Sequence, residues 1–204
     1  MMVSGRLGKN AARVALVFGG LGLSALTISE KAHAADALSH IDAARGYMQK
    51  GDIARTAHEL EVALLDLQDR LGRSLSDQMP APLSGWAAEE AEYEGLGSTG
   101  GGLSVTRGYT KGDASLNASL ILDNPAVDEA QGQSTGQAAA KTIKLGNEDA
   151  TLRWDSSSHS GEITVVLSHR VLIQITGDSL DSDDALMTMA KSMDMAKIRK
   201  IIGL

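Results

Sequence analysis

Apolar and polar positions follow a helical period in the segment between residues 36 and 72. Apolar side chains recur there at steps of three and four residues, which is the spacing of one helix face. They form two runs: Leu38, Ile41, Ala44 and Met48, then Ile53, Ala57, Leu60, Ala63 (or Leu64) and Leu67. Between the runs, Gly51 permits the left-handed turn that ends a helix, and Asp52 can cap the next helix. The pattern predicts two antiparallel helices joined by a tight turn.

The period changes to two beyond the prolines at positions 80 and 82, and such alternation is typical of β-strands. It predicts strands at residues 103–109, 115–122, 149–155, 161–168 and 170–177. A Lys-Gly-Asp turn at residues 111–113 makes the first two strands an antiparallel hairpin. Residues 156–160 and a tight turn at Ser168 and His169 connect the other three strands.

Two further helical segments accompany these strands. One spans about residues 126–139 and is weakened by Gly132 and Gly136. The other begins at Ser182, a predicted N-cap followed by two aspartates, and Asp194 restarts it. The predicted fold class is therefore α+β: an N-terminal antiparallel helical hairpin followed by a twisted antiparallel β-sheet with helices packed on it.

The first 34 residues have the composition of a secretory signal peptide. Arg6, Lys9 and Arg13 precede the uncharged residues 14–29, and Ala32-His33-Ala34 has the small-x-small spacing of a cleavage site. We expect cleavage after Ala34 and a periplasmic protein without a stable membrane anchor. A retained anchor is the alternative, although 16 uncharged residues fall short of the roughly 20 that a spanning helix needs. The predicted domains are then 1–34 signal peptide, 35–79 hairpin and 80–204 sheet domain.

Charge and composition narrow the range of functions. Cleavage would remove four of the 19 basic and one of the 26 acidic residues, leaving a net charge of −10. Such a chain repels nucleic acids and anionic lipids, so we expect neither as a partner. The chain has no cysteine, which excludes disulfides, thiol catalysis and thiolate metal sites. It also has few aromatic rings on which a nucleic acid or a sugar could stack.

Two short motifs match catalytic or cofactor signatures without their structural context. GLGSTG at residues 95–100 has the G-x-G-x-x-G spacing, but Glu89, Glu90, Glu92 and Glu94 precede it and a strand follows, so a bound pyrophosphate would be repelled. GQSTG at residues 132–136 has the G-x-S-x-G spacing around Ser134, but no apolar strand precedes that serine. Nothing in the sequence ties Ser134 to one of the candidate bases: His40, His58, His159 and His169.

Metal-binding patterns are equally incomplete. The acids of residues 89–94 and Asp181, Asp183 and Asp184 lack the spacing and central glycine of a calcium loop. The histidines form no close pair. Methionine thioethers can bind copper, but Met residues at helical spacing more often fill a core; the C-terminal ones are Met187, Met189, Met193 and Met195. We therefore expect no catalytic, cofactor-binding or metal-binding residue, and no cofactor.

The hairpin resembles a single tetratricopeptide repeat. Six residues fall in the register of that repeat: Ala44, Tyr47, Gly51, Asp52, Leu60 and Ala63. Thr56 stands where the family has Ala, and the terminal proline is displaced to Pro80. Such repeats build peptide-binding surfaces from about three copies. One unit alone favours packing on the neighbouring domain or on a second subunit over peptide binding.

The sheet domain resembles the Mog1/PsbP-like fold. The order of its elements carries this resemblance, with Pro82, Gly85, Trp86, Arg107, Tyr109, Gly161, Glu162, Arg170, Val171, Met193 and Asp194. The whole chain resembles a family of uncharacterised bacterial periplasmic proteins in which a helical hairpin precedes such a sheet. Members of that fold are mainly non-enzymatic accessory and assembly factors, so the resemblance implies a protein that is not an enzyme.

These observations lead to two main hypotheses and a third. The first is a non-catalytic periplasmic accessory or assembly protein that binds an envelope protein partner through the hairpin, the Gly-rich loop or the sheet face. The second is a periplasmic small-ligand or metal-binding carrier with its pocket between the sheet and the helices. The third is a hydrolase that uses Ser134.

Overall fold

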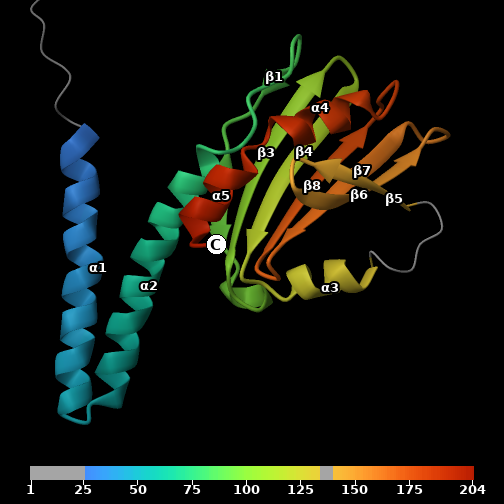
Figure 1. Cartoon of the computed structure of the whole chain (residues 1–204). Coiled ribbons are helices and arrows are strands. Elements are labelled where there is room, and N and C mark those ends of the chain that lie inside the picture. Colours follow the sequence, from blue (N-terminus) through green and yellow to red (C-terminus); the bar gives the residue numbers. More distant parts are fainter. Residues whose placement is uncertain (1–25, 134–139) are drawn as a thin grey trace, which may run out of the picture.

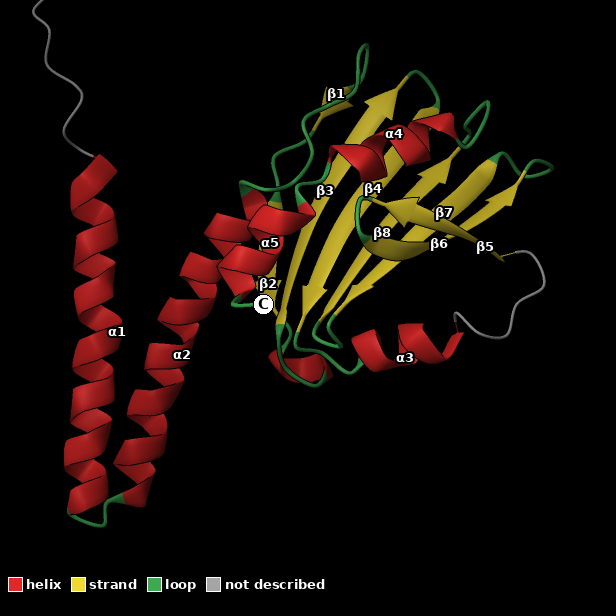
Figure 2. Cartoon of the chain, in the orientation of Figure 1, coloured by secondary structure: helices red, strands yellow, loops and turns green. Residues whose placement is uncertain are grey.

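The computed structural model describes residues 26–133 and 140–204, and it confirms the predicted α+β class. A helical hairpin is followed by an eight-stranded antiparallel sheet with helices packed on it (Figures 1 and 2). The helices are α1 (Leu26–Gln49), α2 (Ile53–Ser76), α3 (Ala126–Gln133), α4 (Asp184–Ser192) and α5 (Met195–Ile202). The strands are β1 (Ala87–Ala88), β2 (Glu92–Gly95), β3 (Leu103–Lys111), β4 (Ala114–Leu122), β5 (Ala140–Leu145), β6 (Glu148–Asp155), β7 (Ser160–Leu167) and β8 (Val171–Asp178).

The strands pair in the order β1-β3-β4-β8-β7-β6-β5, and β2 also pairs with β3. All five predicted strands are confirmed as β3, β4, β6, β7 and β8, together with the turns between them. The turn after β7 places Ser168 and His169 at positive φ, as a tight connection requires. The sequence pattern did not predict β1, β2 and β5, which lie at or beside the two edges of the sheet.

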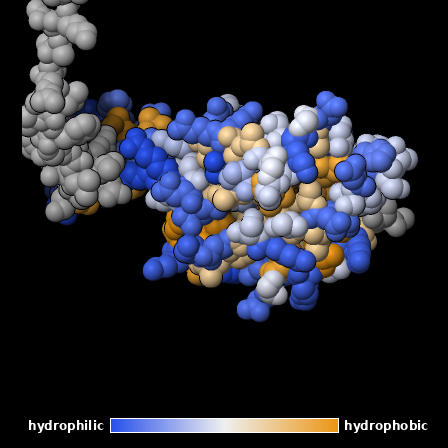
Figure 3. All heavy atoms as spheres, turned by 90° about the horizontal axis from the view of Figure 1, so that it is seen from above, coloured by the Kyte–Doolittle hydropathy of each residue, from blue (hydrophilic) through white to orange (hydrophobic). Residues whose placement is uncertain are grey.

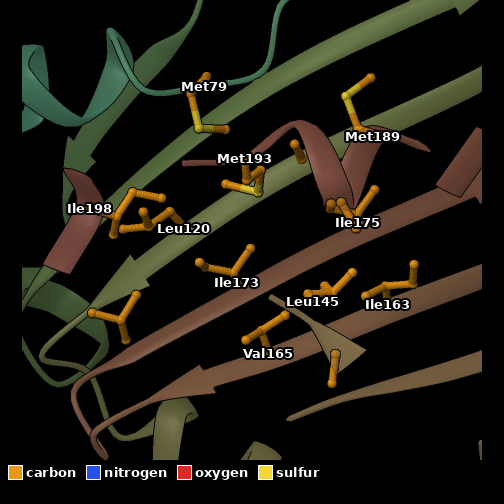
Figure 4. Packing of buried hydrophobic residues seen from close by; sticks show 14 of the residues in the cluster. Met79, Leu120, Leu145, Ile163, Val165, Ile173, Ile175, Met189, Met193 and Ile198 are labelled. Atoms are coloured by element: carbon orange, nitrogen blue, oxygen red, sulfur yellow. The ribbon is translucent and has the colours of Figure 1, made fainter. Parts of the chain in front are cut away.

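One face of the sheet forms the core. Alternate residues of the central strands point to this inner face and are fully buried, for example Val105, Leu120, Ile173 and Ile163. The helices α4 and α5 and the end of α2 cover it, so that their apolar side chains meet those of the strands (Figure 4). The core therefore lies between the sheet and the C-terminal helices.

The outer face of the sheet is mostly polar. Its central row, one residue from each neighbouring strand, consists of Thr106, Ser119, Gln174, Thr164, Thr151 and Thr142. Helix α3 covers one end of this face, where Val127 and Leu172 are buried outside the main core. An antiparallel sheet commonly leaves one face in water, so this polar face needs no ligand to explain it.

The predicted C-terminal helix is divided into two. Ser182 is not the N-cap residue; Asp183 holds that position, and the Ser182 hydroxyl accepts the Asp184 N–H at 3.3 Å. Met193 is extended and ends α4, and Asp194 then caps α5, as the sequence predicted. The Lys197 N–H donates to the Asp194 carboxylate at 3.0 Å, and this bond lowers the pKa of Asp194.

The link between hairpin and sheet is fixed by side chains of β3. The Pro80 carbonyl accepts the Tyr109 hydroxyl at 2.7 Å and Arg107 at 3.2 Å. Burial raises the pKa of Tyr109, so its hydroxyl remains a donor. Arg107 also donates to the Glu89 carbonyl at 2.8 Å and lies over the Tyr109 ring. These contacts hold the chain that leaves α2 against the sheet.

Helix α1 extends further toward the N-terminus than the predicted hairpin. It begins at Leu26, so the predicted cleavage site after Ala34 lies within its backbone. Among the described residues, no helix is both long enough and apolar enough to span a bilayer. The predicted charged and apolar parts of the signal peptide lie largely in residues 1–25, outside the described residues.

Candidate protein-docking surface

Small residues form the contact between α1 and α2. The hairpin residues buried there are Ala37, Ala44, Thr56 and Ala63, each at most 4% exposed. The Thr56 hydroxyl donates to the Asp52 carbonyl at 2.7 Å, which satisfies its one polar group. Because short side chains let the two helices approach closely, the larger apolar residues have no place between them.

Those larger residues are exposed instead. Leu38, Ile41 and Met48 of α1 and Ile53, Leu60, Leu64 and Leu67 of α2 are between 40% and 63% exposed. We call these seven residues the hairpin face. Within the described residues, the exposed large hydrophobics outside it are only Leu65 and Leu204. Hydrophobic side chains are visible at the surface of the hairpin end in Figure 3.

The two halves of the hairpin face lie on the same side of the hairpin. Each residue of an α-helix turns the side chain by about 100°. On α1 the large residues therefore lie roughly 40–120° round the helix from Ala44. On α2 they lie roughly 40–100° round from Ala63, in the same rotational sense. Since the helices are antiparallel, these rotations bring both rows to one surface. The result is an apolar patch on one side of the hairpin rather than scattered leucines.

The apolar row of α2 continues under the sheet domain. Leu71 packs against the core and Leu75 is fully buried in it. These two residues follow Leu64 and Leu67 at steps of three to four on the same helix. The row is covered where α2 contacts β2, β3 and α5, and it is exposed where those contacts end. The hairpin face is thus the uncovered half of an interface.

Charged side chains in and around this patch are paired with one another. Arg45 pairs with Asp42 at 3.1 Å, and Arg55 pairs with Asp52 at 3.5 Å while lying over the Tyr47 ring. His40 Nδ1 lies 2.6 Å from Glu59 and ties α1 to α2. These charged groups are already satisfied within the hairpin, so the patch offers apolar contact area rather than a charged site.

The residues that resemble a tetratricopeptide repeat take structural positions in the hairpin. Ala44 and Ala63 are buried between the helices, as is Thr56 at the position where the family has Ala. Gly51 adopts φ +73° in the turn, and Asp52 accepts the Arg55 N–H at 3.2 Å as the N-cap of α2. Leu60 is different because it is 49% exposed and belongs to the hairpin face.

The Gly-rich loop has the geometry of a connection between two strands. Gly95 ends β2, residues 97–99 form one short 3-10 turn, and β3 begins at Leu103. The motif is therefore followed by a strand, and a strand presents no helix N-terminus to a phosphate. Of the preceding acids, Glu92 and Glu94 belong to β2 and pair with Thr106 and Ser104 of β3. The structure spreads these acids along an edge strand.

The hydrolase hypothesis rests on a serine outside the described residues, and the structure describes only its candidate bases. Ser134 and Gly136 lie outside the described residues, and α3 ends at Gln133 just before them. His159 Nδ1 lies 2.9 Å from the Leu180 carbonyl oxygen, in the turn between β6 and β7. His40 lies in the hairpin and His169 in the turn after β7.

The candidate metal ligands occupy ordinary structural positions. Met189 and Met193 are in the core, and Met187 and Met195 pack against it. Asp184 lies in the first turn of α4, where its carboxylate accepts the Ser182 hydroxyl at 2.9 Å. Among residues 26–133 and 140–204, no group of three or more histidines and carboxylates could hold a metal ion.

A hollow lies between the sheet and the helices, where the carrier hypothesis expects a pocket, but the sequence did not indicate its lining residues. This hollow, of about 630 Å³, lies between the β5–β6 turn and the junction of α4 and α5. Its lining comes from residues 145–148 and from residues 190–196 with Arg199. These segments are far apart in the chain, and the single sign of a boundary in the sequence was the helix restart at Asp194.

No protein-family model, no curated protein and no solved structure matches this chain. The residues that carry the Mog1/PsbP-like resemblance make structural contacts within the domain. Arg170, for example, forms two hydrogen bonds of 2.7 Å to Asp123, and these lower the pKa of that carboxyl. The surfaces of the molecule are therefore the features that bear on its function.

Proposed function

We propose that this protein is a non-catalytic accessory protein of the periplasm and that its hairpin face binds an envelope protein. The observation that carries the proposal is the apolar row of α2, which the sheet domain covers at Leu71 and Leu75 and leaves exposed from Ile53 to Leu67. Large apolar residues gathered on one exposed surface of a folded chain mark interaction sites. The proposal needs no catalytic group, in keeping with the fold-level resemblance.

An amphipathic helix of the partner is the occupant that fits this surface. Two antiparallel helices leave a shallow groove between them, into which the side-chain ridge of a third helix packs. The exposed row from Ile53 to Leu67 is about 21 Å long at 1.5 Å per residue, so it matches about four turns of a partner helix. The partner would supply apolar residues at i, i+3, i+4 and i+7.

Charge favours basic flanks on that partner helix. After the predicted cleavage the chain carries a net charge of −10. A helix with Lys or Arg beside its apolar row would be attracted, whereas an acidic helix would be repelled. The same charge works against a second copy of this chain as the occupant, although the apolar area alone would permit one.

Capture of the partner should depend on the hairpin face. We expect the tagged mature chain to co-purify one defined, helix-containing protein from an envelope extract of its host. Leu60→Glu with Leu64→Glu should lower its yield at least tenfold, because two charges would be buried in an apolar contact. The measurement is quantitative mass spectrometry of the captured material.

Leu65→Glu provides a matched control for this experiment. Leu65 is 60% exposed on the same helix but lies about 140° round from Leu60, outside the hairpin face. Its substitution should leave the yield unchanged. Equal loss with Leu65→Glu, or recovery of a second copy of the chain as the one bound protein, would contradict the proposal.

The periplasmic setting has its own test. If the leader is cleaved as proposed, N-terminal sequencing of protein purified from its host should begin Ala-Asp-Ala at Ala35. The protein should also be released with the periplasmic fraction by osmotic shock. A sequence beginning at Met1 or Met2, or recovery with the cytosol, would contradict export.

A further inference from the structure

The hollow between the β5–β6 turn and the C-terminal helices has buried apolar walls. Leu145, Ala190 and Met193 line it, and each is at most 6% exposed. Figure 4 shows Leu145 and Met193 among the core side chains below α4 and α5. The volume of about 630 Å³ is within the range of roughly 300–1,000 Å³ typical of small-molecule sites. The floor of the hollow is therefore the surface of the core, on the side of the sheet opposite its polar face.

Three features hold the hollow in shape. Met193 is extended between α4 and α5, so the two helices separate at this point and the Asp194 cap begins the second one. On the opposite side, Gly146 adopts φ +62° in the turn after β5. Arg199 joins the two sides, since it donates to Glu148 at 2.8 and 2.9 Å. The site is thus preformed by the fold.

One charged side chain in the lining has no ion-pair partner among the described residues. Both acids are occupied: Glu148 accepts from Arg199, and Asp194 accepts from the Lys197 N–H and lies 3.2 Å from its ammonium. Lys191 also lines the hollow and is exposed. Within the part of the chain that the structure describes, Lys191 forms no ion pair or side-chain hydrogen bond. The chemistry that remains available is therefore an apolar lining with one ammonium at its edge and the exposed amide of Asn147.

We propose that this hollow binds a small apolar carboxylate. The hydrocarbon part of the ligand lies against Met195 and Ala196, over a floor formed by the buried Leu145, Ala190 and Met193. Its carboxylate meets the Lys191 ammonium at the mouth. A cationic ligand is disfavoured because both acids of the lining are already paired. This site is separate from the hairpin face. A negative result for ligand binding would therefore leave the proposed function unaffected, and the reverse also holds.

Decanoate and decylamine test the proposal as a pair of equal chain length and opposite charge. In isothermal titration calorimetry with the mature chain, decanoate should bind with one site and saturate below about 1 mM, whereas decylamine should bind at least tenfold more weakly. Absence of saturable binding of decanoate would overturn the proposal. Equal binding of the two would overturn the role of Lys191.

Three variants locate the binding. Lys191→Gln should weaken decanoate about tenfold through loss of the charged contact. Ala196→Trp, at an exposed lining position, should fill the mouth and abolish binding. Lys200→Gln removes an exposed lysine of α5 that is not part of the lining and should change nothing. A loss with Lys200→Gln as large as with Lys191→Gln, or full binding by Ala196→Trp, would show that decanoate binds elsewhere. Far-UV circular dichroism with thermal melting checks that each variant is folded.

Discussion

Gly177→Val is expected to destabilise the sheet domain by about 3 kcal/mol, at the upper end of the cost of overpacking a core. Gly177 of β8 lies opposite Gly161 of β7 on the inner face of the sheet. A Cβ at Gly177 would lie 2.5 Å from Leu180 Cδ1, 2.9 Å from Leu116 Cδ2 and 3.1 Å from Leu186 Cδ2. These leucines are buried, so none can turn out into solvent without losing its own packing.

The two glycines leave room for helix α4. Leu186 of α4 is fully buried, and a Cβ at Gly161 would lie 2.9 Å from its Cδ1. The absence of side chains at this pair of positions therefore lets Leu186 approach the backbone of both strands. Valine at position 177 pushes α4 away from the sheet, and with it one wall of the hollow beside α5.

Thermal or urea unfolding of Gly177→Val measures this effect. For a chain of this size, 3 kcal/mol corresponds to roughly 10 °C in the melting temperature. Thr176→Val is the control, because Thr176 is the preceding residue of β8 and is exposed on the outer face. Adding Leu180→Ala should cost less than the sum of the two single changes, since it removes the nearest clashing atom. A melting temperature of Gly177→Val equal to that of Thr176→Val would contradict this packing.

The central strands could be predicted from the sequence because their two faces differ so strongly. Inner residues such as Leu116, Ala118 and Leu120 alternate with polar outer residues such as Asn117 and Ser119, and the structure preserves that alternation. The strands that the sequence did not predict, β1, β2 and β5, lack this alternation of apolar and polar residues. β1 has two residues, and β2 consists of Glu-Tyr-Glu-Gly, a sequence with one large apolar residue. β5 pairs with β6 alone, so half of its residues stay exposed.

The candidate sites were harder to predict, for a reason visible in α1 and α2. Periodicity correctly indicated both helices, but it could not show which residues would make their contact. Small residues such as Ala44 and Ala63 take that position, and Leu60 and Leu64 remain outside. The hollow depends on an approach between residues 145–148 and the α4–α5 junction, and a distant approach of this kind leaves no local pattern in a single sequence.

Gly72→Leu should loosen the contact between the hairpin and the sheet at β2. Gly72 is buried on α2, and a Cβ there would overlap Cδ2 of the Tyr93 ring and lie 2.6 Å from its Cγ. The ring cannot move without cost, because its hydroxyl donates to Asp69 at 2.7 Å and accepts from Arg73 at 3.2 Å. The substitution thus breaks the contact between α2 and β2 at its closest point.

Hydrogen exchange of the backbone amides is the appropriate measurement. In Gly72→Leu we expect amides of β2 and of the last two turns of α2 to exchange at least tenfold faster, while those of β8 keep their protection. Gly46→Leu is the matched control: it is also a helical glycine, but a Cβ there would meet no heavy atom within 4 Å, so its exchange should not increase. Unchanged protection of β2 in Gly72→Leu would mean that Tyr93 does not hold the hairpin in place. Because the hairpin face ends before Gly72, the variant should still capture its partner. This result would separate the docking of the hairpin on the sheet from its proposed role in binding.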